Sequence, residues 1–229
     1  VLMNDIDPES GQEMREAYVR KVPGNTMPVA LSDVLSCDGK HLWMRSQKID
    51  FEGRRLEIAV KPAAEQDPED FHLFSQIGFL DDSYFFRSYW TFGRRMVGGY
   101  GGWFQAGRLV PAGRILCFDD SRVYGYGRKP AYMVNASVIE YELFAADKSV
   151  TREAIDRVSK ASRKIDARLN RKNPNSSDWR LRYFFPREDL TAVQPAWLVD
   201  QPAVIARAMA VAGGTLFLAG PPDVVDERE

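Results

Sequence analysis

The sequence predicts an all-β fold, a partial β-propeller of about four to five blades of four-stranded antiparallel sheet, with one helical insertion. Three observations predict it: a turn pattern that recurs along the chain, the spacing of its copies, and one segment with helical periodicity. The 229 residues are 45% hydrophobic and carry a formal net charge of -1. Because a nucleic-acid-binding domain is expected to be basic, this balance argues against a nucleic-acid partner.

The recurring pattern consists of an apolar strand end, a turn of two Asp or Gly residues, a small or polar residue, and a strand that carries aromatics. Its copies begin at Cys37, Leu80, Phe118 and Ala212. Asp-Gly, Asp-Asp and Gly-Gly pairs tolerate the positive φ angles that tight turns between twisted strands require. Each copy therefore predicts a β-hairpin.

The spacing of these hairpins predicts a repeat. Their turns fall at positions 38, 81, 119 and 213, so the first two intervals are 43 and 38 residues and the third, 94, is about twice as long. Propeller blades recur about every 40 to 50 residues. A further blade is therefore expected between residues 120 and 213, with strands at 138–144 and 179–185. We treat residues 1–229 as one propeller segment, part of a longer chain, that needs further blades or another subunit to close.

A helix is predicted at residues 151–172, where the period of the apolar residues changes. Ile155, Val158, Ile165 and Leu169 recur at helical spacing, Thr151 is a suitable N-cap, and Pro174 follows the end. The other face is rich in arginine and lysine. A basic amphipathic helix can bind an anionic membrane or nucleic acid. Because the apolar stripe is thin and has no aromatic residue, a solvated helix packed on the outside of the propeller is favoured.

Two sets of motifs resemble known propeller families. Residues 6–13, Ile-Asp-Pro-Glu-Ser-Gly-Gln-Glu, resemble the Asp-x-x-Ser/Thr-Gly turn of the PQQ-like, quinoprotein-type repeat, which also occurs in the outer-membrane assembly lipoprotein propeller. Arg15 stands where those repeats usually have a tryptophan that docks between blades. From about residue 30 onward the chain resembles an uncharacterised bacterial family of large PQQ-like propeller proteins, on motifs that include residues 78–82, 87–90, 106–108, 111–116, 124–128, 207–210 and 219–223.

The resemblance implies a periplasmic or secreted propeller of unsettled activity, and it transfers no catalytic residue. A quinoprotein dehydrogenase would hold PQQ with a stacked tryptophan, a calcium ion and a catalytic aspartate, often with a disulfide between adjacent cysteines. Cys37 and Cys117 are far apart, and an interpretation as buried thiols is favoured for both. The Asp pairs at 81–82 and 119–120 could ligate a metal, but their place at the repeat turns explains them without one. PQQ with calcium is thus the alternative, and no cofactor or metal is expected.

The stretch from residue 84 to 128 interleaves seven arginines with twelve aromatic residues. Arginine forks bind carboxylate, sulfate or phosphate, and aromatic faces stack on sugar rings. Such a surface would suit an anionic carbohydrate. The alternative is that the aromatics fill the space between blades and the arginines bridge to carboxylates. If the surface binds a ligand, the ligand-facing residues are predicted to be Arg87, Tyr89, Trp90, Trp103 and Arg128.

Three functions stay open at this point. The leading hypothesis is a non-catalytic, extracytoplasmic binding or scaffolding module for an anionic carbohydrate or a protein partner, on the analogy of other propellers. The second is part of a divergent quinoprotein oxidoreductase or a carbohydrate-active propeller enzyme. The third is an assembly scaffold that pairs with partner strands at a blade edge. No apolar run is long enough to be a transmembrane segment.

Overall fold

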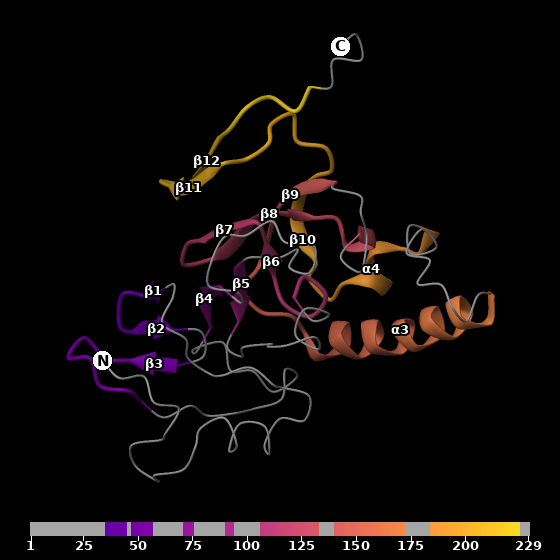
Figure 1. Cartoon of the computed structure of the whole chain (residues 1–229), viewed down its shortest axis with the longest axis horizontal. Coiled ribbons are helices and arrows are strands. Elements are labelled where there is room, and N and C mark those ends of the chain that lie inside the picture. The colour runs from indigo at the N-terminus through magenta and orange to yellow at the C-terminus, as the bar shows by residue number, and fades with distance from the viewer. Residues whose placement is uncertain are drawn as a thin grey trace.

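A computed structural model describes residues 35–44, 47–56, 71–75, 90–93, 106–132, 140–172 and 184–224 (Figure 1). These residues form mostly strands, arranged in several small antiparallel sheets, together with helices. The predicted all-β character is confirmed at this level. The described residues do not show a closed propeller, and the sheets have two, three or four strands rather than four throughout.

Two three-stranded sheets come first along the chain. One contains β1 (Leu35–Cys37), β2 (Leu42–Met44) and β3 (Gln47–Ile49), and the other contains β4 (His72–Ser75), β5 (Trp90–Gly93) and β6 (Ala112–Gly113). The Ser36 hydroxyl donates a hydrogen bond to the Leu73 carbonyl and joins β1 to β4. Trp43 in β2 stacks on His72 in β4, with ring centroids 3.7 Å apart. The two sheets therefore pack through side chains of their neighbouring strands.

The four-stranded sheet runs in sequence order, β7 (Ile115–Phe118), β8 (Arg122–Arg128), β9 (Tyr141–Asp147) and β10 (Pro195–Val199). Every pair is antiparallel. Gly125 in β8 is required where the Phe144 ring lies over the strand, because a Cβ there would overlap that ring and approach Leu116 to 2.8 Å. This meander has four antiparallel strands, the number expected of one blade.

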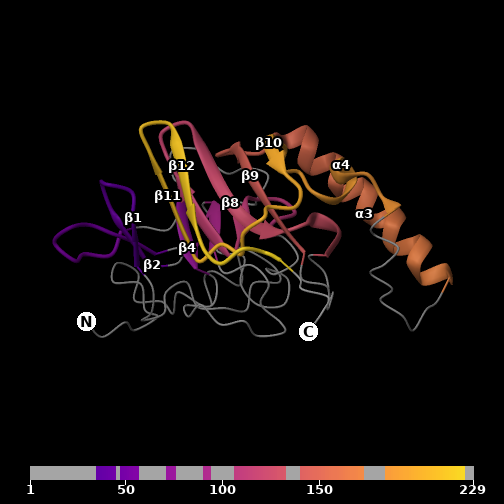
Figure 2. The ribbon, with the colours of Figure 1, turned by 90° about the horizontal axis from the view of Figure 1, so that it is seen from above.

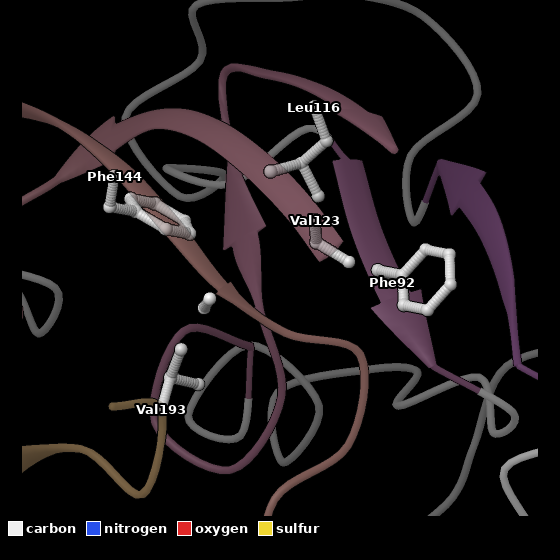
Figure 3. Packing of buried hydrophobic residues seen from close by; sticks show 6 residues of the cluster. Phe92, Leu116, Val123, Phe144 and Val193 are labelled. Atoms are coloured by element: carbon white, nitrogen blue, oxygen red, sulfur yellow. The ribbon is translucent and has the colours of Figure 1, made fainter. Parts of the chain in front are cut away.

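The main core lies between the four-stranded sheet and β5 (Figure 3). One face of the sheet contributes Leu116, Val123, Phe144 and Ala146, and these pack with Phe92 and Val193. All six are nearly fully buried. Because alternate residues of each strand point to opposite faces, the residues between these core residues lie on the other face of the sheet.

Three of the four predicted hairpin turns are confirmed, and the fourth, at Asp81, lies outside the described residues. In the first, the Asp38 Oδ1 accepts hydrogen bonds from the backbone N–H groups of Lys40 and His41, at 2.8 and 2.6 Å. Its Oδ2 accepts one from the Trp43 Nε1–H at 2.8 Å. The side chain thus satisfies the turn and fixes the aromatic residue that follows it.

The turn at Asp119 repeats this bonding. Its Oδ1 accepts from the backbone N–H groups of Ser121 and Arg122 at 2.8 and 2.9 Å, and its Oδ2 accepts from the Tyr124 hydroxyl at 2.9 Å. The turn between β11 (Ala208–Ala212) and β12 (Thr215–Ala219) has Gly213 and Gly214 at φ 56° and 74° instead. The repeat seen in the sequence is therefore a structural repeat at Asp38 and Asp119.

The helix predicted at 151–172 is α3 (Arg152–Lys172), and Thr151 caps it by accepting from the Ala154 N–H at 3.2 Å. Two further helical segments are short, η3 (Pro130–Tyr132) and α4 (Arg187–Leu190). Ile155 and Val158 pack with Ala192 and Leu109, and Ile165 packs with Leu190. Since β9 and β10 are neighbours in one sheet, α3 lies in the connection between paired strands (Figures 1 and 2).

The two strands predicted for this part of the chain need correction. The first, at 138–144, is β9, and it begins at Tyr141 and continues to Asp147. The second, at 179–185, is wrong at its described end, because Phe184 and Phe185 lie in a short 3-10 turn and a bend. The strand that pairs with β9 is Pro195–Val199. The alternating pattern of residues 179–185 predicted a strand, but which segment becomes a strand depends on its tertiary pairing partner, and β9 pairs with 195–199.

Candidate functional site

The candidate site is the face of the four-stranded sheet opposite the main core. The register places Cys117, Tyr124, Ala145 and Trp197 in one row across the four strands, and Ile115, Tyr126, Leu143 and Val199 in the next. The β11–β12 hairpin lies against β7 at one side of this face (Figure 2). On the β10 side, Trp197 and Val199 are 37% and 42% exposed. We call this exposed part, with Tyr124, Arg128 and Tyr141, the open face.

Tyr124 and Trp197 meet over the small side chain of Ala145, with ring centroids 6.2 Å apart and planes tilted by 40°. The hydrogen bond to Asp119 raises the pKa of Tyr124 and holds its hydroxyl at the turn. Hydrogen bonds from Ser121, Arg122 and Tyr124 lower the pKa of Asp119 below its usual range. The turn therefore fixes one ring of an exposed aromatic pair.

A second pair of rings lies at the other end of the open face. Tyr126 and Tyr141 stack with centroids 4.8 Å apart, and the Tyr141 hydroxyl lies 3.5 Å from Arg114 Nη1, which donates to it. Burial raises the pKa of Tyr126, and a hydrogen bond with the backbone of Ala206 opposes the rise. Because Tyr126 is 1% exposed, Tyr141 is the ring of this pair that reaches the surface.

Among the described strands, β10 is one of the two end strands of this sheet. Trp197 and Val199 point to the open face and Leu198 points to the other, and all three are exposed by more than a third. Among the described strands, β10 pairs with β9 alone. Lys129 binds Glu140 at 2.9 Å and Asp200 at 3.3 Å, which anchors the end of β10. Burial lowers the pKa of Lys129, but these hydrogen bonds outweigh it and the pKa is raised.

On the core side, a small hollow contains an ion pair between the buried carboxylate of Glu142 and the partly buried side chain of Arg187. Arg187 donates to both carboxylate oxygens of Glu142, at 2.6 and 2.7 Å, and so ties α4 to β9. Burial raises the pKa of Glu142, and the bonds and charge of Arg187 oppose that rise. The hollow, lined also by Gly107, Phe144 and Thr191, has about 10 Å³ of room, which is space for about one water molecule. It is too small for an organic cofactor.

Sequence reasoning found part of the open face. Of the predicted ligand-facing residues, Arg87, Tyr89 and Trp103 lie outside the described residues. Trp90 begins β5 and packs against the main core, which favours the packing interpretation for it. Arg128 ends β8 opposite Tyr141, on the open face. Trp197 was missed, although an apolar Trp-Leu-Val run next to Pro195 was a readable sign of an edge strand.

The structure describes both cysteines and one of the two aspartate pairs considered as metal ligands. Cys37 is exposed, so the expectation of a buried thiol is wrong for it, and Cys117 is half-buried; both are free. Burial, with the charge of Asp119, raises the pKa of Cys117 to about 11, which keeps it a thiol at neutral pH. Within the described ranges, no three His, Cys, Asp or Glu side chains gather as a metal site would require. Asp81 and Asp82 lie outside these ranges.

Comparison with family models, curated proteins and solved structures finds no significant match. The resemblance to PQQ-like propellers therefore stays a prediction from the motifs. No helix in the part of the chain described here is long and apolar enough to cross a membrane.

Proposed function

We propose that the chain is a non-catalytic binding and scaffolding module of β-propeller type that holds a protein partner at the free edge of β10. The observation that carries the proposal is the exposure of three consecutive apolar side chains, Trp197, Leu198 and Val199, on an end strand. Proteins normally protect such an edge with charges, proline or a covering segment, because its free backbone groups can pair with another chain. A location outside the cytoplasm is supported by the family resemblance alone.

The edge suits an extended segment of a partner protein. A strand added to β10 would form hydrogen bonds with the outer backbone groups of β10. Its side chains would contact Leu198 on one face of the sheet and Trp197 and Val199 on the other. Pro195 and Asp200 flank this run and limit pairing to its length. The Tyr124 ring beside Trp197 extends the apolar contact on the open face.

The test is a selection of extended peptides on the immobilised protein, followed by binding measurements on variants. Selected peptides should bind the wild type and should lose most of their affinity on Trp197→Lys and Leu198→Lys. Phe217→Lys places a charge on an exposed apolar residue of another strand, so it is the control and should bind normally. Circular dichroism checks that each variant folds. The proposal fails if no peptide is selected, or if both β10 variants bind as well as the wild type.

An anionic carbohydrate is the second candidate, favoured by the tyrosine stack and the arginines beside it. Tyr141 reaches the surface, Arg114 contacts its hydroxyl, and Arg128 lies opposite it in the register. Sugar rings stack on such faces, and guanidinium groups bind carboxylate or sulfate. Binding of a polyuronate, but not of neutral dextran, that weakens on Arg128→Ala while Trp197→Lys has no effect would assign the site to carbohydrate.

A further inference from the structure

The β11–β12 hairpin is an apolar element with an open outer edge. Residues 208–219 contain no charged side chain, and among the described strands β12 pairs with β11 alone. Phe217, at the middle of β12, is 58% exposed. An isolated two-stranded hairpin is marginally stable in water, and added strands stabilise it. The outer edge of β12 can therefore pair with a further strand, and such pairing would stabilise the hairpin.

The register shows which backbone groups face that edge. Gly213 and Gly214 form a two-residue turn, and Ala212 and Thr215 pair across it. In such a hairpin the residues that flank the turn exchange both hydrogen bonds, and the bonding alternates along the ladder. Thr215, Phe217 and Ala219 therefore bond to β11. Leu216 and Leu218 direct their N–H and C=O groups to the outer edge of β12.

We propose that this edge pairs with the same edge of a second copy of the chain, antiparallel and centred on Phe217. This register places Leu216 of each copy opposite Leu218 of the other, where both residues offer outward N–H and C=O groups. Four hydrogen bonds then form across the interface. Phe217 meets its own counterpart at the position without backbone bonds, where side chains are closest and aromatic pairs are favourable.

Self-pairing is favoured by the symmetry of the strand itself. The strand sequence Thr-Leu-Phe-Leu-Ala is nearly palindromic, because Phe217 has a leucine on each side and a small residue at each end. A two-fold axis through Phe217 therefore matches like with like, as an isologous interface requires, and opposes no like charges. Two hairpins joined in this way form a four-stranded antiparallel sheet, the same strand number as β7 to β10. This association involves β12, so evidence against it would leave the function proposed for β10 unaffected, and the reverse also holds.

Sedimentation velocity over a wide concentration range tests the proposal directly. The wild type should be a dimer that dissociates on dilution, and Phe217→Lys and Phe217→Asp should each lose the dimer because like charges meet at the axis. An equimolar mixture of the two variants should recover a heterodimer. Trp197→Lys, on β10, should dimerise as the wild type does. A wild type that stays monomeric, or a Phe217→Lys protein that still dimerises, overturns the proposal.

Disulfide trapping tests the register. On a Cys37→Ser background, which removes the exposed thiol, Phe217→Cys should cross-link to its own counterpart on mild oxidation. Thr215→Cys should not, since its neighbour across the interface is Ala219, but a mixture of Thr215→Cys and Ala219→Cys should. Equal cross-linking of all single variants would exclude this register. A monomeric wild type that binds selected peptides through Phe217 would assign the edge to a different protein instead.

Discussion

The turns at Asp38 and Asp119 have the same local structure, but the aromatic residues that they hold have different surroundings. In both, one carboxylate oxygen accepts two backbone N–H groups and the other accepts from an aromatic residue five positions on. Trp43 is then buried, 4% exposed, and stacked on His72. Tyr124 stays partly exposed beside Trp197. The local sequence makes the turn, and the neighbouring sheet decides whether its aromatic residue becomes core or surface.

Removal of the two aromatic side chains should show this difference most strongly. Trp43→Ala is expected to lower the free energy of unfolding by about 3 to 5 kcal/mol, the usual cost of deleting a large buried aromatic residue. Tyr124→Ala should cost much less, because its ring is partly exposed on the open face. Urea denaturation followed by circular dichroism measures both. Equal losses would contradict the assignment of Trp43 to the core and Tyr124 to the surface.

Substitution of the two aspartates should give a smaller contrast. Asp38→Asn turns one acceptor toward Trp43 into a donor, and the indole N–H can only donate, so about 1 to 3 kcal/mol should be lost. Asp119→Asn should be better tolerated, because the Tyr124 hydroxyl can accept as well as donate. The same denaturation assay compares them. Trp43→Phe, which removes the indole N–H, should make Asp38→Asn nearly neutral.

The features that the sequence predicted correctly are those with a local cause. The turns at 38, 119 and 213 follow from aspartate and glycine chemistry, and α3 follows from apolar spacing and a Thr151 cap. The strand expected at 179–185 and the missed β10 depend on which segment pairs with β9. The Glu142–Arg187 pair joins residues 45 positions apart and left no local signal. Arg128 was found because its residue type suited the proposed ligand, whereas Trp197 needed the fold.

The pH dependence of stability offers a third test, with the smallest expected effect. Burial raises the pKa of Asp38, but bonds from Trp43, Lys40 and His41 outweigh it and lower the pKa from 3.8 to about 2. Because the folded protein binds this proton more weakly than the unfolded chain, the carboxylate stabilises the fold above about pH 4 and loses this effect as the pH falls toward 2.

The loss attributable to Asp38 should be at most about 2 kcal/mol, since one pKa unit corresponds to about 1.4 kcal/mol and solvent screening reduces it. Urea unfolding of the wild type and of Asp38→Asn at a series of pH values between 5 and 2 measures it. The stability difference between the two proteins should narrow as the pH falls. A constant difference over this range would mean that the carboxylate of Asp38 does not act through its charge, and that the turn depends on hydrogen-bond geometry alone.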